Sequence, residues 1–432
     1  MRIVQVIPDF GLGGIQKAGC VLAKGLNDRG HQAMVIARGG GPRYEGPDAK
    51  DAPHLIVPDA STETLGGAIL DFRPDVVHIQ TGAYDEPLVE WLAAAGANRP
   101  LVVSTPVFGR PPLNRETLKK TRTAVVGTYI LHRLRHWLGM SLDDALRAGV
   151  AFTPVVSFQQ ADGGVSTLMP PEDRARLRAE FGLPADAEVL GRVGRNAIDK
   201  WSSKNVELID KFLSRRPKGA WLSVGMPTGL GTDDLRQRWG DRFVSLPESS
   251  DYALLTRAYA SMDLQAFFSP FGECFAATIC EPAGLGLPTI AATNPIRDNG
   301  QSEQVVDGET GYLVAGVDDA LARADALLDN PDELRKLNKR TFDYAAARWT
   351  PEVITDVLLQ LYEAWLSDDP LRHPRMQAIA DEARRFDETY LPRMLKLHAA
   401  NPLARLTWSA RLLAVRNWGL FNGVARVKRM LG

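Results

Sequence analysis

Short apolar runs alternate with helical patterns through most of the chain. An apolar run at 3–7 predicts a buried strand, and a glycine turn at 11–14 follows it. The next segment has apolar residues at the helical period before Gly30, namely Ile15, Ala18, Val21, Leu22 and Leu26. Further strands are predicted at 34–37, 75–79 and 101–104, the last two separated by an alanine-rich helical stretch. Continuous apolar strands with helices between them indicate a parallel sheet covered on both faces.

A second series of strands and helices follows a change in composition. Residues 162–188 are rich in turn-forming residues around one short charged helix, and they predict a domain junction. Five apolar runs come after it, at 189–194, 220–224, 243–246, 264–268 and 288–292. We therefore expect an α/β protein with two Rossmann-like, doubly wound parallel-sheet domains facing across a cleft. The expected domains are 1–165 and 186–345, and a helical extension at 346–432 is expected to pack partly on the first.

Composition supports an ordinary globular protein. The chain has 432 residues, of which 45% are hydrophobic and 24% charged, so two domains are expected. Lys and Arg number 51 against 52 Asp and Glu, and this balance predicts no nucleic-acid partner. The three cysteines form no ligand cluster, which favours reduced thiols and a cytoplasmic protein. No apolar run reaches about 18 residues, and Pro8 ends the first run too early for a signal peptide.

Two carboxylates mark the strongest chemical motif, between Phe271 and Pro288. Glu273 precedes a short predicted helix, and Glu281 lies within it. Free amides at such a helix start suit a diphosphate, and a carboxylate on an apolar helix suits ribose or sugar hydroxyls as hydrogen-bond donors. Taken singly, Glu273 is more simply a capping charge and Glu281 an exposed helix residue. Their spacing together with Gly272, Gly286 and Pro288 favours a ligand site.

This stretch resembles the paired-glutamate motif of retaining glycosyltransferases of family 4, which have the GT-B fold. The family motif is Glu-x-Phe-Gly-x-x-x-x-Glu-Ala with a Gly-x-Pro continuation, and the matching residues are Glu273, Phe275, Glu281, Gly286 and Pro288. The resemblance implies that Glu273 contacts the donor sugar and Glu281 the nucleotide ribose. It also implies that Cys274, Phe275 and Ala276 adjoin the donor.

Two positions depart from the family motif. Ala276 replaces a glycine, which is tolerable only at negative φ. Pro282 replaces an alanine and removes an amide from inside the helix, so we expect a kinked or shortened helix.

A second match follows the strand at 189–194. The segment from Gly194 to Lys200 resembles the family's Gly-Arg-x-x-x-x-Lys, which implies that Arg195 and Lys200 neutralise the departing diphosphate. Gly194 is assigned to donor binding, and Lys204 is a further cation nearby. The alternative is a solvated basic loop.

Weaker matches lie elsewhere in the chain. Gly13 and Gly14 resemble the family's N-terminal Gly-Gly loop and are assigned to donor binding, although such turns are common in α/β proteins. Residues 302–314 resemble another family segment, in which the glycines are expected to turn a hairpin.

The family often has a histidine after the strand that ends near Thr105, and this chain has none there. His78 and His132 remain candidates for that role, but lone histidines of this kind are more often structural.

Two segments are rich in basic residues. Residues 110–136 contain seven Lys or Arg and one acid, and residues 401–432 contain six with no acid, interleaved with Trp408 and Trp418. Such a composition is typical of a helix on a membrane surface. A helix docked on the protein itself explains it equally well, and an acidic glycan or a partner subunit are further alternatives for the tail.

The predicted function is retaining, metal-independent transfer of a sugar from a UDP- or GDP-linked donor to a hydroxyl acceptor. Residues 1–165 are assigned to the acceptor side and 186–345 to the donor. No Asp-x-Asp element is present for a metal ion, and the nucleotide-diphosphate sugar is a co-substrate, so no cofactor is expected. The acceptor is expected to be a glycan or lipid-linked glycan, reached in the cytoplasm or at the inner membrane face. A non-catalytic GT-B scaffold and a nucleotide-sugar epimerase are the alternatives.

Overall fold

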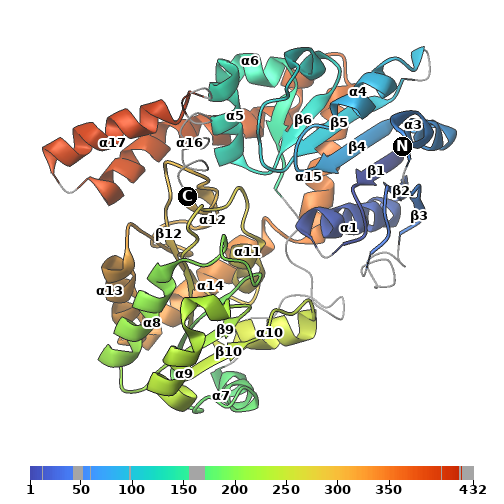
Figure 1. The fold of residues 1–432 in the computed structure, drawn as a ribbon. Coiled ribbons are helices and arrows are strands. Elements are labelled where there is room, and N and C mark those ends of the chain that lie inside the picture. The colour runs from blue at the N-terminus through green and yellow to red at the C-terminus, as the bar shows by residue number, and fades with distance from the viewer. Residues whose placement is uncertain are drawn as a thin grey trace. The chain divides into compact units, whose positions relative to one another are not determined.

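The chain divides into two compact units. A computed structural model describes residues 1–11, 13–41, 52–58, 60–96, 99–154, 171–399, 401–417 and 420. Unit 1 comprises 1–157, 351–395 and 405–432, and unit 2 comprises 158–350 and 396–404. Figure 1 labels the helices and strands of both units. The predicted boundary at residue 165 lies outside the described residues.

Unit 1 contains a seven-stranded sheet of order β3-β2-β1-β4-β5-β6-β7, and every strand pair is parallel. The strands are β1 (Arg2–Ile7), β2 (Gln32–Ala37), β3 (His54–Ile56), β4 (Val76–Thr81), β5 (Leu101–Pro106), β6 (Arg122–Val125) and β7 (Val150–Phe152). The apolar runs predicted β1, β2, β4 and β5. Three short strands, β3, β6 and β7, were not predicted.

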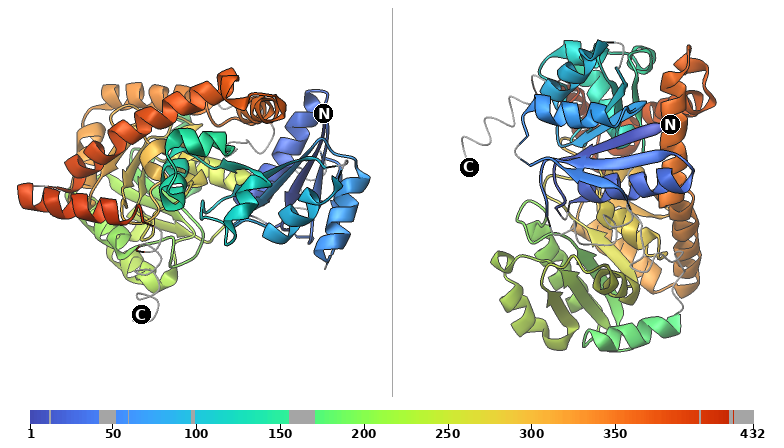
Figure 2. Two further views of the ribbon diagram at one scale, coloured as in Figure 1. Left: turned by 90° about the horizontal axis from the view of Figure 1, so that it is seen from above. Right: turned by 90° about the vertical axis from the view of Figure 1, so that its right-hand side faces the viewer.

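The helices of unit 1 cover both faces of this sheet (Figure 2). Val4 and Val6 pack on one face with the apolar residues of α3 and α4, whereas α1 packs on β1 and β2. Gly30, at φ 80°, terminates the turn after α1 as expected. The helices are α1 (Gly14–Asp28), α3 (Thr62–Asp71), α4 (Glu86–Ala93), α5 (Thr128–Leu138), α6 (Leu142–Arg147), α15 (Pro351–Leu366), most of α16 (Pro374–His398) and α17 (Pro402–Ala414), with 3-10 turns η3 (Arg115–Lys119) and η6 (Pro370–Arg372).

Unit 2 contains a six-stranded parallel sheet of order β10-β9-β8-β11-β12-β13. Its strands are β8 (Glu188–Val193), β9 (Gly219–Val224), β10 (Phe243–Leu246), β11 (Leu264–Phe267), β12 (Thr289–Ala292) and β13 (Gly311–Val314). Its helices are α7 (Pro171–Glu180), α8 (Ser203–Arg215), α9 (Thr232–Trp239), α10 (Tyr252–Ser261), α11 (Ala277–Ala283), α12 (Gln301–Gln304), α13 (Val317–Leu328) and α14 (Pro331–Ala346), with 3-10 turns η4 (Thr228–Leu230) and η5 (Gly240–Arg242). The predicted α/β class with two doubly wound parallel sheets is confirmed.

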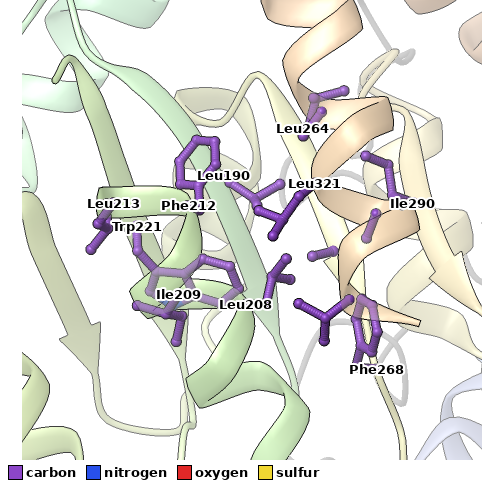
Figure 3. Close-up of a cluster of buried hydrophobic side chains, with 14 of the residues drawn as sticks. Leu190, Leu208, Ile209, Phe212, Leu213, Trp221, Leu264, Phe268, Ile290 and Leu321 are labelled. Atoms are coloured by element: carbon purple, nitrogen blue, oxygen red, sulfur yellow. The ribbon is translucent and has the colours of Figure 1, made fainter. Parts of the chain in front are cut away.

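One face of the unit 2 sheet packs on α8 and α13 through large apolar side chains. Trp221 from β9 and Phe212 from α8 are fully buried, and Leu321 of α13 joins them (Figure 3). This cluster extends to Phe268, directly after β11. It therefore fixes the carboxyl end of β11, from which a predicted site loop begins.

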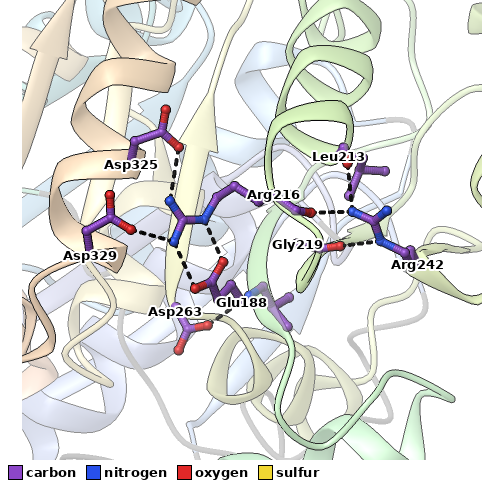
Figure 4. Close-up of polar contacts among 9 residues, drawn as sticks. Glu188, Leu213, Arg216, Gly219, Arg242, Asp263, Asp325 and Asp329 are labelled. Carbon is purple, nitrogen blue, oxygen red and sulfur yellow. Dashed lines mark hydrogen bonds and ion pairs between the residues drawn. The ribbon is translucent and has the colours of Figure 1, made fainter.

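The amino ends of the unit 2 strands are tied together by arginines (Figure 4). Arg216 donates two hydrogen bonds to the carboxylate of Glu188, the first residue of β8, and also binds Asp325 and Asp329. Arg242 donates to the carbonyls of Leu213, Arg216 and Gly219. These contacts lie at the end of the sheet opposite the predicted chemical motifs, so their role is structural.

The predicted hairpin at 302–314 is wrong. Residues 301–304 form the short helix α12, and β13 pairs in parallel with β12. The glycine turn is real, since Gly308 has φ 80°, but it connects a helix to a strand. A Cβ on Gly311 would lie 2.1 Å from the Thr289 carbonyl oxygen, so Gly311 permits close strand pairing. Within the described residues, the helices are all too short or too polar to cross a membrane.

Candidate functional site

The candidate site lies where the strand order of unit 2 reverses. Successive strands are added on one side of β8 up to β10, and the chain then returns to place β11 on its other side. The loops that follow β8 and β11 therefore leave the sheet at adjacent carboxyl ends, the usual ligand position in such sheets. The first loop contains Gly194, Arg195 and Lys200, and the second contains Glu273.

Lys200 and Glu273 form an ion pair across these two loops. The Lys200 Nζ lies 2.6 Å from Glu273 Oε1, and the side chains are 23% and 20% exposed. Burial raises the pKa of the Glu273 carboxyl above its ordinary value, and the Lys200 ammonium offsets part of that effect. Both side chains are thus exposed enough for a ligand to reach them. They are also shielded enough from water that electrostatic interactions with a ligand are stronger than in bulk solvent.

A buried arginine beneath this pair was not predicted. Arg192, 2% exposed, donates to the Lys200 carbonyl at 2.5 Å, to Asn205 Oδ1 at 2.9 Å and to the Phe268 carbonyl. Its guanidinium also lies 4.7 Å from the ring centroid of Trp201. Burial lowers the pKa of Arg192, and the nearby charge of Glu273 opposes that shift. Arg192 therefore fastens both site loops and adds positive charge near Glu273.

The loop that carries Arg195 and Lys200 is held at several points along its length. The Asn196 amide donates to Glu248 Oε2 at 2.9 Å, and Trp201 Nε1 donates to the Arg195 carbonyl at 3.0 Å. The Arg195 side chain itself is exposed. Gly225, at φ 78°, lets the next loop approach closely, because a Cβ there would lie 2.0 Å from the Gly194 carbonyl oxygen. The exposed guanidinium of Arg195 thus projects from a well-anchored loop.

The loop that carries Glu273 is held by residues 298–304. The Gly300 amide donates to the Glu273 carbonyl at 2.7 Å, and the Glu273 amide donates to Gln301 Oε1 at 3.3 Å. Gly272 has φ 67°, and a Cβ there would lie 1.6 Å from the Asp298 carbonyl oxygen, so only glycine fits. These contacts set the position from which the Glu273 carboxylate projects.

The residues after Glu273 are more enclosed than the motif suggested. Ala276 has φ −98°, the negative value that its methyl group requires, but its amide donates to Gln304 Oε1 at 2.9 Å. Cys274 is buried, and Phe275 packs against the cluster around Trp349. The Ala276 amide is therefore already bonded within the protein.

A buried glutamine side chain compensates for the proline inside helix α11. Pro282 has no amide hydrogen to donate to the Thr278 carbonyl, and the buried side chain of Gln265 does so instead, at 2.7 Å. The helix ends one residue later, at Ala283, and is the short helix that we expected. Glu281 is half-buried on it, and the Tyr259 hydroxyl donates to Glu281 Oε2 at 3.4 Å. Burial raises the pKa of Tyr259, so its hydroxyl stays protonated.

The N-terminal candidates lie in unit 1. Gly13 and Gly14 begin α1, and the Gly11 amide and the Gln16 side chain both donate to Asp9 Oδ1. Within the described residues, no group of three or more His, Cys, Asp and Glu side chains is placed to hold a metal ion.

His78 is part of the unit 1 core. Its Nε2 lies 2.7 Å from Thr105 Oγ1 and its Nδ1 lies 2.8 Å from the hydroxyl of Tyr362 on α15. Thr105 donates to the Ala124 carbonyl, so it accepts from His78 Nε2–H, and Nδ1 accepts from Tyr362. Burial lowers the pKa of His78 to about 3, and the neutral ring serves as a structural link.

The other candidate histidine is also enclosed. His132 lies on α5, is 5% exposed and has its Nδ1 2.5 Å from Asp387 Oδ1 on α16. Burial lowers the pKa of His132. Neither histidine therefore replaces the one that the family often has near Thr105.

The basic segment at 110–136 is not a uniform cationic surface. Arg133 and Arg135 are buried, the first donating to the Phe108 carbonyl at 2.7 Å and the second bound to Asp387. Lys119 and Lys120 pair with nearby glutamates. In the tail, Arg405 and Arg411 are exposed on α17, whereas Trp418 and residues 421–432 lie outside the described part.

Part of the chain is similar in sequence to curated glycosyltransferases. The chain is 32% identical over 205 residues to D-inositol 3-phosphate glycosyltransferase 2 of Catenulispora acidiphila, covering 43% of this chain and 47% of that protein. It spans about half the length of the curated relatives it matches. No family model matches.

Solved structures agree in fold. A glycosyltransferase from Rickettsia africae has a TM-score of 0.68 at 17% identity, over 85% of this chain and 99% of that chain. Anabaena HepE in complex with UDP has a TM-score of 0.64 at 17% identity, over 84% of this chain and all of that chain. The chain therefore has the GT-B fold, and its matched part is similar to D-inositol 3-phosphate glycosyltransferases, in agreement with the resemblance drawn from its motifs.

Proposed function

We propose that the chain is a retaining, metal-independent glycosyltransferase that uses a nucleotide-diphosphate sugar. The observation that carries the proposal is the Lys200–Glu273 ion pair at the strand-order reversal of unit 2. A cation and a carboxylate at this position match the two needs of the reaction. One neutralises a departing diphosphate, and the other holds sugar hydroxyls.

In the proposed reaction, the acceptor hydroxyl forms a bond to the anomeric carbon as the bond to the phosphate oxygen breaks. The acceptor proton passes to the leaving phosphate. Lys200 and Arg195 stabilise the charge that develops on the diphosphate, which is the role a metal ion has in other transferases. Glu273 orients the sugar. Gly194 and the segment from Cys274 to Ala276 adjoin the donor in unit 2, and no cofactor takes part.

Glu281 is proposed to bind the ribose of the donor nucleotide. Its carboxylate can accept from both vicinal hydroxyls, and the Tyr259 hydroxyl, 3.4 Å from Oε2, holds one oxygen in place. The protonated, buried tyrosine donates to this carboxylate, so it orients the glutamate and leaves its other oxygen for the ribose.

The donor is proposed to be UDP-linked in preference to GDP-linked. HepE, which shares the fold, binds UDP, and this supports a uridine nucleotide here. The acceptor is proposed to be a glycan or lipid-linked glycan hydroxyl. Contact with the inner face of a membrane, through 110–136 and 401–432, would bring the chain to such an acceptor.

A transfer assay tests the proposal. The full chain is incubated with UDP- and GDP-sugars and hydroxyl acceptors in the presence of a chelator, and released nucleotide and product anomer are measured. We expect nucleotide release with an α-linked product from an α-linked donor, reduced at least about 100-fold in Glu273→Ala. A free epimeric nucleotide sugar would instead identify an epimerase. Donor binding without turnover would identify a scaffold.

A further inference from the structure

Helix α17 exposes a row of leucines along one side. Leu403, Leu406 and Leu413 are 75%, 70% and 57% exposed, and their spacing of three and seven residues puts them on one helix face. Leu412, on the opposite face, is only 3% exposed. The hydrogen bond from Trp137 Nε1 to the Val415 carbonyl, 2.9 Å long, also anchors the helix end to α5. The helix is thus held by one face, while the leucines of the other face are exposed.

The charge around this leucine face has one sign. Arg405 and Arg411 are exposed on α17, and Asp and Glu are absent from the sequence between 401 and 432. The Arg411 guanidinium lies 5.3 Å from the ring centroid of Trp408. Trp408 lies four residues before Leu412, on the docked side of the helix. An exposed leucine face with arginines beside it is what a helix lying in a lipid interface requires.

The other basic segment does not offer such a helix face, because its helix α5 is buried and its exposed Leu113 lies in a loop. In 110–136, the guanidinium groups of Arg133 and Arg135 bond within unit 1, and Lys119 and Lys120 have carboxylate partners. Each of these four charges therefore has a partner within the protein, although the two lysine pairs lie at the surface.

We propose that the leucine face of α17 docks in the plane of an anionic lipid bilayer. A second copy of the chain is a poorer occupant, because it would oppose arginines to arginines. The chain's own residues 421–432 contain three cations and no acid, so their charge does not complement that of Arg405 and Arg411. A surface of anionic headgroups over acyl chains satisfies both the charge and the exposed leucines.

Vesicle cosedimentation tests this surface without requiring transfer activity. The membrane proposal can therefore fail while the proposed transferase function holds, and the transferase function can fail while the membrane proposal holds. The full chain is mixed with vesicles of phosphatidylcholine alone or with one quarter phosphatidylglycerol. We expect binding only to the anionic vesicles, weakened about 10-fold or more by 0.5 M salt. The variant Leu406→Ser/Leu413→Ser is expected to lose at least about 10-fold in partitioning. Leu366→Ser, which removes a half-exposed leucine at the end of α15, is the matched control.

Two further readouts keep the test decisive. Arg405→Gln/Arg411→Gln should weaken anionic binding while leaving the melting temperature unchanged, because both arginines are exposed. Unchanged binding in the leucine variant overturns the proposal, as does a wild type that ignores anionic vesicles. Leucine-dependent dimerisation in light scattering without vesicles also overturns it, because a second copy would then cover the face.

Discussion

The Lys200 ammonium and the Glu273 carboxylate are 2.6 Å apart although 73 positions separate them in the sequence. Each follows a different parallel strand, and the sheet order brings those strands together. Arg192 fastens the backbone of both loops from below. The pair is therefore set in place before any ligand arrives, which is the preorganisation that electrostatic catalysis needs.

Glu273→Gln should stabilise the fold at neutral pH. The carboxyl pKa of Glu273 is raised by burial, so the folded state favours its protonated form. Its favourable contribution is present below the ordinary pKa of 4.5 and is lost as the pH rises through the folded value. We expect the Gln variant to gain about 1 kcal/mol over the wild type at pH 7.5, as measured by urea denaturation. The gain should vanish near pH 4.

The control for this variant is an ion pair that is not part of the site. On α8, the Lys211 Nζ lies 2.7 Å from Glu207 Oε1, and the two side chains are 39% and 47% exposed. Glu207→Gln should change stability by less than about 0.5 kcal/mol at either pH. A Glu273→Gln variant that is less stable than the wild type at pH 7.5 would show that the ion pair outweighs the burial of the carboxylate.

Arg192→Met should destabilise unit 2 and alter the pH dependence of donor binding. The variant leaves the Lys200 carbonyl and Asn205 Oδ1 without their donor, at about 3 kcal/mol in total, whereas the Phe268 carbonyl still accepts from Asn205 Nδ2. It also removes a positive charge from the surroundings of Glu273, whose pKa then rises further. Donor binding needs an ionised Glu273. As the pH is lowered, the donor affinity of the variant should therefore begin to fall at a higher pH than that of the wild type.

Arg216→Met separates these two effects. Arg216 binds Glu188 at the amino ends of the same strands, far along the sheet from the Lys200 loop. This variant should lose stability, yet keep the wild-type pH profile of donor affinity measured by calorimetry. If both variants give the same profile, Arg192 has only a structural role.

Gln265→Leu should cost less when Pro282 is also replaced. In the wild type, Gln265 donates to the Thr278 carbonyl that Pro282 cannot reach with an amide hydrogen, so the leucine variant should lose about 1–3 kcal/mol. Pro282→Ala restores that amide. The loss in the double variant should then shrink by about 1 kcal/mol in a double-mutant cycle of unfolding free energies. Equal losses in both backgrounds would refute the compensation.

Most of the fold could be predicted because buried parallel strands are continuous apolar runs. The runs around Ile3, Val77 and Leu222 lie in β1, β4 and β9. The missed strands are short or start with polar residues, as β6 does at Arg122. The hairpin was wrongly predicted because Asp307-Gly308 is a turn signal that does not reveal which elements it joins.

The site could be predicted in part. Lys200 and Glu273 were assigned to one donor site from two separate motifs, but their direct ion pair was not predicted. Arg192 could have been noticed as a charge inside an apolar strand, which is costly unless it is bonded. The contacts of Gln301 and Gln304 could not have been predicted from the sequence. They depend on how closely a distant loop approaches Glu273 and Ala276.

The central claim is that unit 2 binds the donor nucleotide through Lys200 and Glu281. The most direct test is to measure the affinity of the full chain for a nucleoside diphosphate. Isothermal calorimetry with UDP and GDP, without metal, would compare the wild type with Lys200→Met, Glu281→Gln and the control Lys211→Met. We expect one nucleotide to bind the wild type, and Lys200→Met and Glu281→Gln to weaken it about 10- to 100-fold. Lys211→Met should bind as the wild type does. Wild-type affinity in Lys200→Met, or no binding to the wild type at millimolar nucleotide, would contradict the account.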